Sequence, residues 1–381
     1  MKAAILGYGF VGSGAYEITR DFPTGIEVKR VLTRTPRPEL PYITQDFDDI
    51  LNDPEIEIVA EAMGGLHPAY EYVTAAMKAG KHVVSANKQL ICHYYEELFA
   101  LAAEMGVQLR FTPSAGGGIP WLCNLMRVKR CDEVSELSGI LNGTTNYILH
   151  CMTHEGLPFQ QVLADAQRKG YAEADPSADI DGIDALRKCA ISASLAFDTI
   201  VEEDSLQAFG IRHITKEDVD NFRSLGRVCK LLVRAKKYEN GRIAAFVEPT
   251  LLSPDAPESA VPLNGNMTTL VGKWIGRLSL MGQGAGKYPT GSSLVQDMID
   301  ISEHASPIKA GSGTVRADNT LEVHPYYIRS SFNFREIKEQ MKVEVNGRYC
   351  ITEPMSVADA HELAAHIRKT DPAAFFAGIA E

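Results

Sequence analysis

Short apolar runs alternate with helix-like segments over about the first 110 residues of the chain. One segment with helical periodicity ends near residue 20. Two more are residues 69–79, followed by Gly80 as the C-cap, and residues 94–105. Runs typical of buried strands lie between them, at residues 3–6, 28–32, 56–63, 82–85 and 107–112. Such alternation predicts βαβ units with a parallel sheet.

The pattern changes further along the chain, where longer helices are expected. Helical segments are predicted at residues 146–153, 159–169, 184–197 and 219–233. They are followed by strands at 243–249 and 267–275, a helix at 293–304 and a strand at 323–329. Ser356, with an acid three residues later, is typical of a helix start. The predicted fold class is α/β, with an N-terminal Rossmann domain and a second, α+β domain.

Composition narrows the possible functions. The formal net charge of −11 argues against nucleic-acid binding, which needs basic surface to meet phosphates. The chain shows no apolar stretch long enough for a membrane span and no signal-peptide pattern at its start. The seven cysteines are scattered without a CxxC pair, which makes a zinc site improbable and suits a reducing compartment. We therefore expect a cytoplasmic protein.

Residues 7–12, GYGFVG, form a GxGxxG motif that follows a strand and opens a helix. The first glycine permits a tight turn, the second lets a pyrophosphate approach the backbone, and the third lets the helix pack on the strand. The helix N-terminus offers N–H groups to the phosphates. We therefore expect a nicotinamide dinucleotide to be bound by Gly7, Gly9, Phe10, Val11 and Gly12.

The end of the second strand bears on the choice between NAD and NADP. An acid at this place would bind the ribose hydroxyls of NAD, but the sequence has Thr33 and Arg34, with Arg37 close by. A guanidinium suits a 2′-phosphate. Arg34 therefore favours NADP, while NAD stays open because an arginine there can also be merely solvated.

Six further segments carry a resemblance to a known family. In chain order they are GKHVVSANK at 80–88, GGGIP at 116–120, GILNGTTNYIL at 139–149, GYAEADP at 170–176, DIDGIDALRK at 179–188, and GQGAG at 282–286. In this order and spacing the chain resembles the homoserine dehydrogenases over about residues 1–330. The resemblance implies an NAD(P)-dependent oxidoreductase that interconverts L-homoserine and L-aspartate 4-semialdehyde, in threonine, methionine and isoleucine biosynthesis. It also implies a homodimer or higher homo-oligomer.

The predicted domains follow from the pattern and the resemblance together. Residues 1–125 are expected to bind NAD(P), and 126–310 to bind substrate and dimerise. Residues 311–330 would return a strand to the nucleotide domain. Residues 331–381 would form a short C-terminal extension of unknown role.

Two lysines are the candidates for proton transfer to or from the substrate oxygen. Asp181, Asp184 and Lys188 follow one another at spacings of three and four residues, which would place them on one face of a predicted helix. The helix continues almost entirely in small or apolar residues, so it is expected to be buried, where charges must be paired or functional. The resemblance gives Lys188 the acid/base role and Asp184 substrate binding, and it places Lys88 near the nicotinamide and the substrate.

The resemblance supplies the remaining site residues. Glu173 would bind the substrate ammonium and, with Gly170, contact the cofactor. Asp179 would support Asp184 or Lys188, although an ordinary acidic loop is an equal alternative. Gly284 or Gly286, in the second glycine-rich loop, would contact the cofactor.

The sequence departs from the family at two places. Members often hold sodium with backbone carbonyls, here Ala115, Gly117 and Ile119, and a glutamate, but this chain has Thr112 at the glutamate position. Losing the carboxylate weakens cation binding, so a sodium site is doubtful. The second departure is the tail, 331–381, which looks too short for the βαββαβ regulatory domain of many members and does not show its pattern.

Two other functions remain open. One is a related NAD(P)-dependent dehydrogenase acting on another amino or hydroxy acid, which homoserine turnover assays would separate. The other is a nucleotide sensor without turnover, which the presence of Lys88 and Lys188 disfavours.

Overall fold

The computed structural model describes all residues of the chain except 38, 333–343, 347–348 and 381. Its elements fall into two units, each built from separate stretches of sequence. The first unit comprises Met1–Cys131, Ser194–Ile200 and Gly282–Gly313, and the second comprises Asp132–Ala193, Val201–Met281 and Thr314–Glu381. Among the described residues, no helix is long and apolar enough to cross a membrane.

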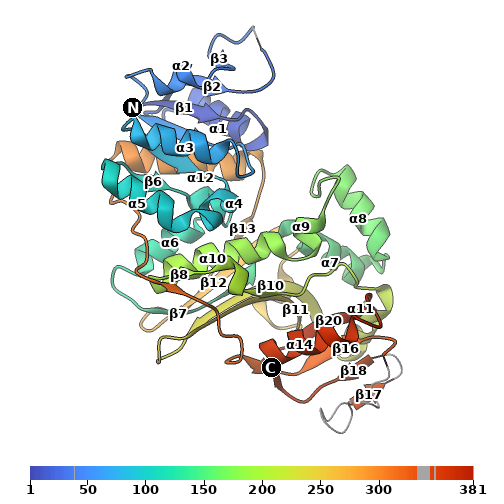
Figure 1. Cartoon of the computed structure of the whole chain (residues 1–381). Helices are drawn as coiled ribbons and strands as arrows, with labels where there is room; N and C mark the ends of the chain where they lie inside the picture. Colours follow the sequence, from blue (N-terminus) through green and yellow to red (C-terminus); the bar gives the residue numbers. More distant parts are fainter. Residues whose placement is uncertain (38, 333–343, 347–348, 381) are drawn as a thin grey trace. The chain divides into compact units, whose positions relative to one another are not determined.

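A parallel sheet of six strands forms the centre of the first unit (Figure 1). Its order, β3-β2-β1-β4-β5-β6, is the strand order of a Rossmann sheet, which confirms the predicted fold class. The strands are β1 (Lys2–Leu6), β2 (Glu27–Leu32), β3 (Ile43–Thr44), β4 (Ile58–Glu61), β5 (His82–Ser85) and β6 (Leu109–Arg110). The strands β1 and β4 are almost entirely buried, as expected for the middle of a sheet covered on both faces.

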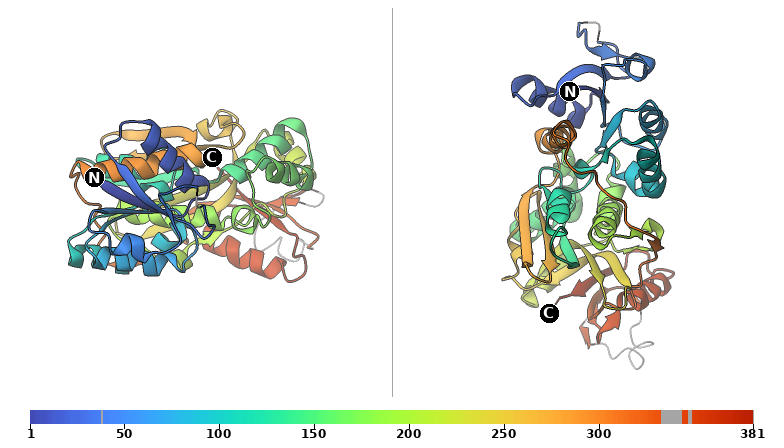
Figure 2. Two further views of the ribbon diagram at one scale, coloured as in Figure 1. Left: turned by 90° about the horizontal axis from the view of Figure 1, so that it is seen from above. Right: turned by 90° about the vertical axis from the view of Figure 1, so that its left-hand side faces the viewer.

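Helices cover both faces of this sheet (Figure 2). The helices of the first unit are α1 (Phe10–Asp21), α2 (Asp48–Leu51), α3 (Ala69–Lys78), α4 (Lys88–His93), α5 (Tyr95–Met105), α6 (Trp121–Val128) and α12 (Lys287–Ser302), with a 3₁₀ turn η1 (Thr112–Ser114). From far along the chain, α12 returns to pack against α1. Added Cβ atoms at Gly14 and Gly291 would lie 2.2 Å from the carbonyl oxygen of Lys287 and 2.8 Å from the amide of Ala15, so both glycines are needed for this close crossing.

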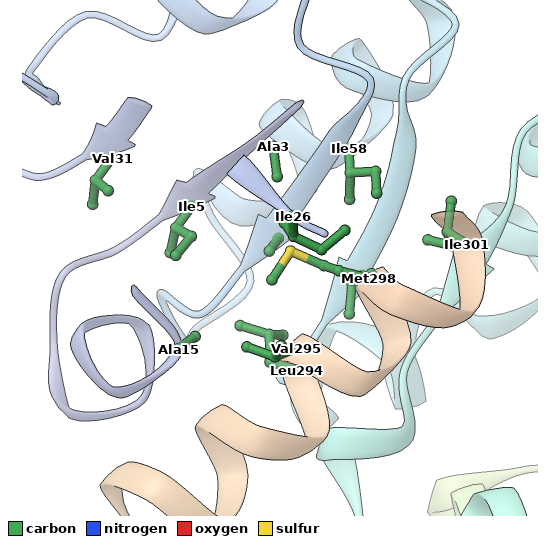
Figure 3. Close-up of a cluster of buried hydrophobic side chains, with 12 residues drawn as sticks. Ala3, Ile5, Ala15, Ile26, Val31, Ile58, Leu294, Val295, Met298 and Ile301 are labelled. Atoms are coloured by element: carbon green, nitrogen blue, oxygen red, sulfur yellow. The ribbon is translucent and has the colours of Figure 1, made fainter. Parts of the chain in front are cut away.

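The core of the first unit lies between α1, α12 and the sheet (Figure 3). Ile5 and Ile58 point from the strands towards Leu294, Val295 and Met298 of α12, and all five side chains are fully or almost fully buried. A fully buried aliphatic side chain contributes about 1.5–3 kcal/mol. The cluster therefore makes α12 an integral part of the first unit.

The second unit contains a mostly antiparallel sheet in the order β13-β12-β7-β10-β11-β20-β16-β18-β17, with β9 paired to β11. Its strands are β7 (Val134–Ile140), β9 (Gln207–Ala208), β10 (Val228–Lys237), β11 (Ile243–Leu252), β12 (Gly265–Gly272), β13 (Gly276–Gln283), β16 (Tyr326–Arg329), β17 (Glu344–Asn346), β18 (Tyr349–Ile351) and β20 (Phe375–Ile379). Two short pairs join β8 (Ile200–Val201) with β14 (Thr314–Val315), and β15 (Val323–His324) with β19 (Met355–Ser356).

Among the described residues, six helices and two 3₁₀ turns accompany the second sheet. They are α7 (Gly143–Glu155), α8 (Phe159–Arg168), α9 (Ser177–Ile180), α10 (Ile183–Phe197), α11 (Lys216–Ser224) and α14 (Val357–Ile367), with η2 (Glu203–Ser205) and η3 (Pro257–Ala260). The thiol of Cys189 on α10 lies 3.5 Å from the carbonyl oxygen of Arg234 on β10. This contact places α10, the helix that carries Lys188, against the sheet.

The predicted return of a strand at residues 323–329 to the nucleotide domain is wrong. Here β16 pairs with β20 and β18 in the second sheet, and β15 pairs with β19. The segment that returns to the first unit is Gly282–Gly313, with α12. Tyr326, Tyr327 and Ile328 are fully buried in their own sheet, so the apolar pattern was correct and only its destination differed.

The expectation that residues 331–381 lack a βαββαβ pattern is also revised. Along the chain the described elements are β16, β17, β18, the short β19, α14 and β20, and the strands that join the large sheet have the order β20-β16-β18-β17. This is the strand order of a ferredoxin-like βαββαβ unit. Residues 333–343, which connect β16 with β17, lie outside the described residues. The edge strand of this ferredoxin-like unit, β20, pairs in parallel with β11 and so continues the sheet of the second unit.

One predicted helix does not exist as drawn from the sequence. Residues 219–233 contain the end of α11 and the start of β10. Gly226, with a φ of +65°, separates the two elements, because the left-handed conformation ends the helix there. The other long helices and the strand 82–85 lie at or close to their predicted positions. The helix start at Ser356 is confirmed, since its hydroxyl accepts the amide N–H of Asp359.

Candidate functional site

The glycine motif has the geometry that a dinucleotide needs. Gly7 has a φ of +100°, and a Cβ there would lie 2.8 Å from the carbonyl oxygen of Ala62. Gly9 faces open space, whereas a Cβ on Gly12 would lie 2.0 Å from the carbonyl oxygen of Gly7. Gly7 thus forms the turn and Gly12 lets the helix pack on the strand, while the backbone at Gly9 is open. Phe10, 74% exposed, begins α1.

Cationic side chains follow β2, at the carboxyl edge of the first sheet. Arg34 is exposed, and its carbonyl oxygen accepts the side-chain amide of Gln45 at 2.7 Å. The guanidinium of Arg37 lies 5.4 Å from the ring centroid of Tyr8, which is the first variable residue of the glycine motif. Two guanidinium groups are therefore available beside the loop where the adenosine half of a dinucleotide is held in Rossmann domains.

Lys88 follows a polar turn that is held by several hydrogen bonds. It is the first residue of α4, whose N-cap Asn87 accepts the amide N–H of Leu90. Asn87 also donates to the carbonyl oxygen of Gly65 at 2.6 Å and lies 3.5 Å from the buried carboxylate of Glu61. Ser85 donates to the other oxygen of Glu61 at 2.6 Å. The ends of β4 and β5 are thus tied together directly before Lys88.

The second unit contains a compact cluster around Lys188. Its ammonium lies 2.8 Å from the carboxylate of Asp184, one helical turn earlier on α10, and 2.8 Å from the carbonyl oxygen of Leu141. The side chains of Lys188 and Asp184 are only 11% and 8% exposed. A buried ion pair is costly to desolvate and needs further hydrogen bonds to be tolerated.

Asn142 supplies such bonds and was not singled out from the sequence. Its side-chain amide donates to Asp184 at 2.8 Å and to Asp179 at 2.7 Å. Burial and the nearby Asp184 raise the pKa of Asp179. Asn142 is the N-cap of α7. In the sequence it lies within the segment 139–149 that carries the family resemblance, but the helix was expected to begin only at residue 146.

Glu173 lies on an exposed loop that α7 and α8 hold in place. The hydroxyl of Thr144 donates to the carbonyl oxygen of Tyr171 at 2.6 Å, and Gln167 donates to the carbonyl oxygen of Glu173 at 3.1 Å. The loop starts at Gly170, which has a φ of +75°. The carboxylate of Glu173 is exposed and does not belong to the hydrogen-bonded cluster of Lys188.

The second glycine-rich loop packs against the GGGIP segment within the first unit. A Cβ on Gly117 would lie 2.2 Å from the carbonyl oxygen of Gly284, so two backbones touch there. Gly286, with a φ of +137°, is the N-cap of α12. The backbone itself thus requires glycine at 117 and 286. A contact of Gly284 or Gly286 with the cofactor is a separate question.

The residues at the expected sodium position do not fit a cation site. The hydroxyl and amide of Thr112 both donate to the buried carboxylate of Asp297, at 2.7 and 2.9 Å. The carbonyl oxygen of Gly117 accepts the Ser293 hydroxyl, and that of Ile119 accepts the amide of Trp121. Protein donors thus engage two of the three expected carbonyls, and an alcohol replaces the expected carboxylate, which is the stronger ligand for a hard cation.

The structure brings together part of the predicted site. Lys188, Asp184 and Asp179 form one cluster, as the helical spacing predicted for the first two. Glu173 lies outside this cluster, and Lys88 belongs to the first unit, whereas the cluster belongs to the second.

Comparison with known proteins gives a consistent result. Residues 7–112 match the family model described as the NAD binding domain of homoserine dehydrogenase, and residues 120–299 match that of homoserine dehydrogenase. The chain is 41% identical over 319 residues to homoserine dehydrogenase of Synechocystis, covering 79% of this chain and 73% of the relative. It is 36% identical over 315 residues to that of Bacillus subtilis, covering 79% and 72%.

Solved structures extend the similarity to the whole chain. A homoserine dehydrogenase from Thiobacillus denitrificans has a TM-score of 0.88 at 30% identity, covering 100% of this chain and 98% of that one. The enzyme of S. aureus, in a crystal structure at pH 7.5, has a TM-score of 0.76 at 28% identity, with the same coverage.

Proposed function

This chain belongs to the homoserine dehydrogenase family, and we propose that it interconverts L-homoserine and L-aspartate 4-semialdehyde with a nicotinamide dinucleotide, using Lys188 as the acid and base. The observation that carries the proposal is the buried pair of Lys188 and Asp184, anchored on Leu141 and Asn142. A paired, almost buried ammonium is a suitable group for proton transfer.

The roles of the residues follow from the reaction. When bound, the nicotinamide supplies or accepts the hydride at C4 of the substrate. In the reducing direction Lys188 gives a proton to the aldehyde oxygen, and in the oxidising direction it takes the proton of the homoserine hydroxyl. Asp184 orients the ammonium of Lys188 by the 2.8 Å bond between them. Lys88, at the start of α4, assists by orienting or polarising the same oxygen.

Carboxylates are proposed to hold the amino-acid end of the substrate. Glu173, exposed on the loop after α8, is the partner for the substrate ammonium. Asp184 binds the substrate as well, and Asp179 supports it through Asn142. An ammonium needs acceptor oxygens of this kind, since it has three donors and no acceptor.

We propose NADP as the preferred cofactor. Arg34 and Arg37 follow β2, and neither Thr33 nor Arg34 can act as the acidic ribose ligand typical of NAD enzymes. The pyrophosphate would lie at the N-terminus of α1, beside Gly9, where a ligand can approach the backbone. Gly284 and Gly286 remain candidates for contacts near the nicotinamide.

We also propose that the protein is at least a homodimer. Apolar side chains stay exposed on the β12–β13 hairpin of the second unit: Trp274 is 75% exposed, Ile275 49% and Met281 66%. Large exposed apolar side chains on an edge strand and its turn favour burial against another chain. Molar mass measured by light scattering across a dilution series tests this.

The direct test of the function is a steady-state assay. We expect L-homoserine to reduce NADP⁺, with a higher kcat/KM than in the reaction with NAD⁺. Alcohols without the amino-acid group should turn over far more slowly. Absence of homoserine turnover with either cofactor, in protein that binds NADPH, would remove the proposed reaction and leave the fold and cofactor site standing.

A further inference from the structure

Asn142 is the junction on which the groups around Lys188 are assembled. It lies between β7 and α7 and is 4% exposed. Its Nδ2 donates to Asp179 on α9 and to Asp184 on α10, at 2.7 and 2.8 Å. Its Oδ1 accepts the amide of Thr145 at 2.8 Å. Three helices, α7, α9 and α10, therefore meet at one side chain.

The orientation of this amide is determined by its surroundings. Because Oδ1 accepts a backbone N–H, the NH₂ group must face the two carboxylates, and a flipped amide would place oxygen against oxygen. An NH₂ group has two donors, and the two acids use one each. No hydroxyl or carboxylate at position 142 could make both bonds while keeping the cap of α7.

The two acids need such a bridge because they lie side by side, with Asp184 buried and Asp179 half-buried. Asp179 and Asp184 are close enough to bond the same nitrogen atom, and burial together with Asp184 raises the pKa of Asp179. Like charges at this separation repel, and donors to both carboxylates reduce that cost. Lys188 contacts the residue next to Asn142, since it donates to the carbonyl oxygen of Leu141.

We propose that Asn142 is a positioning residue of this site: its amide keeps Asp179 and Asp184 side by side and thereby fixes the carboxylate that orients Lys188. The inference rests on the proposed function, because it assigns Asn142 to the geometry of that reaction. Asn142 does not itself exchange a proton, and its effect reaches the substrate through Asp184 and Lys188.

The variant Asn142→Asp separates this role from a purely structural one. Aspartate is as good an N-cap as asparagine, so a residue that only starts α7 would tolerate the change. As a bridge it fails, because an ionised aspartate has no donor and adds a third negative charge. The charged groups facing position 142 are Asp179 from α9 and Asp184 with Lys188 from α10.

The expected effect depends on pH. At about pH 8 we expect kcat/KM for homoserine to fall about 100-fold, as for a catalytic group displaced by about 1 Å. Activity should partly return at lower pH, because a proton on the acid cluster restores an O–H donor. Asn142→Ser, which keeps a cap but cannot bridge both acids, should lower activity without this recovery. Ser356→Ala, which removes the cap of α14, serves as the control with unchanged kinetics.

A second measurement does not depend on turnover. The side-chain carboxyls of ¹³C-labelled aspartates are titrated by NMR, and the signal of Asp179 is identified by its loss in Asp179→Asn. In Asn142→Asp we expect Asp179 to titrate at higher pH than in the wild type, with the melting temperature little changed. Wild-type kinetics, or an unmoved Asp179 titration, would overturn the inference. A wild-type enzyme without homoserine turnover, but with the expected shift, would instead count against the proposed reaction alone.

Discussion

At position 188 one ammonium group is held by two oxygens of different kinds. The carboxylate of Asp184 and the carbonyl oxygen of Leu141 lie each at 2.8 Å, so two of three N–H donors have fixed directions. The proposed mechanism uses the third for the substrate oxygen. Fixing a flexible lysine in advance removes an entropic cost that would otherwise be met during the reaction.

The arginine after β2 provides a residue-scale test of cofactor choice. Replacing Arg34 by serine should lower kcat/KM for NADP⁺ by about 10- to 100-fold, the equivalent of about 1.5–3 kcal/mol for a charge-assisted contact. With NAD⁺, which lacks the 2′-phosphate, kcat/KM should change little.

Arg20→Ser is the matched control for this variant. Arg20 is also exposed, but it lies near the C-terminal end of α1 and pairs with Asp21. An equal loss with both cofactors in Arg34→Ser would show that the arginine stabilises the loop and does not select the phosphate.

The site could be predicted from sequence where spacing along one helix was sufficient. Asp184 and Lys188 are four residues apart, and the structure places them in contact. Asn142 lies 42 positions before Asp184, and its two bonds depend on how α7, α9 and α10 are packed. Periodicity contains no information about such a contact, so the side chain that joins the cluster was not recognised from the sequence.

At the scale of elements, α12 is held in place by hydrogen bonds and an ion pair as well as by its apolar face. Asp297 is fully buried on α12 and accepts two bonds from Thr112, next to β6. Burial raises the pKa of its carboxyl to about 7. Nearby Arg110, also buried, pairs with Asp300 at 2.8 Å.

The raised pKa predicts a pH-dependent contribution to stability. In the unfolded chain Asp297 ionises near pH 4, whereas in the folded protein it stays protonated until about pH 7. Its contribution is therefore fully present below pH 4 and declines as pH rises to about 7.

Urea unfolding of wild type and Asp297→Asn measures this contribution. The wild type, relative to the variant, should be more stable at about pH 5 than at about pH 8. The asparagine does not titrate, so the variant shows the pH dependence that all other groups cause. A difference between the two proteins that is the same at both pH values would contradict the assignment to Asp297.

Elements were predicted well where their pattern was local. The strand His82–Ser85 and the helix Tyr95–Met105 follow from apolar periodicity and flanking turn signals. The break at Gly226 was missed because the apolar positions continue through it from α11 into β10. The strand Tyr326–Arg329 was recognised, but its partners β18 and β20 lie later in the chain and cannot be derived from its own composition.

At the scale of the whole molecule, the C-terminal segment is part of the second unit's sheet. Phe376 on β20 is 1% exposed and packs with Phe209, whose ring stacks on His361 of α14. Arg329 on β16 forms a buried ion pair with Asp218 on α11 at 2.9 Å. The tail therefore shares a core with residues that precede it by more than a hundred positions.

Truncating this core should destabilise the protein. Phe376→Ala is expected to lower the free energy of unfolding by about 3–5 kcal/mol, as for other buried phenylalanines. Val323→Ala, at a side chain 56% exposed, is the control and should have little effect. Equal unfolding midpoints for the two variants would show that the tail contributes little to the stability of the sheet.

The central claim is that the ammonium of Lys188 transfers the substrate proton, and Lys188→Ala tests it most directly. The measurement is kcat for L-homoserine oxidation, with the Kd for NADPH determined on the same samples. We predict that kcat falls by about 10²- to 10⁴-fold, the usual contribution of general acid–base catalysis, while NADPH binding is unchanged. A variant that binds NADPH and oxidises homoserine at the wild-type rate would contradict the account.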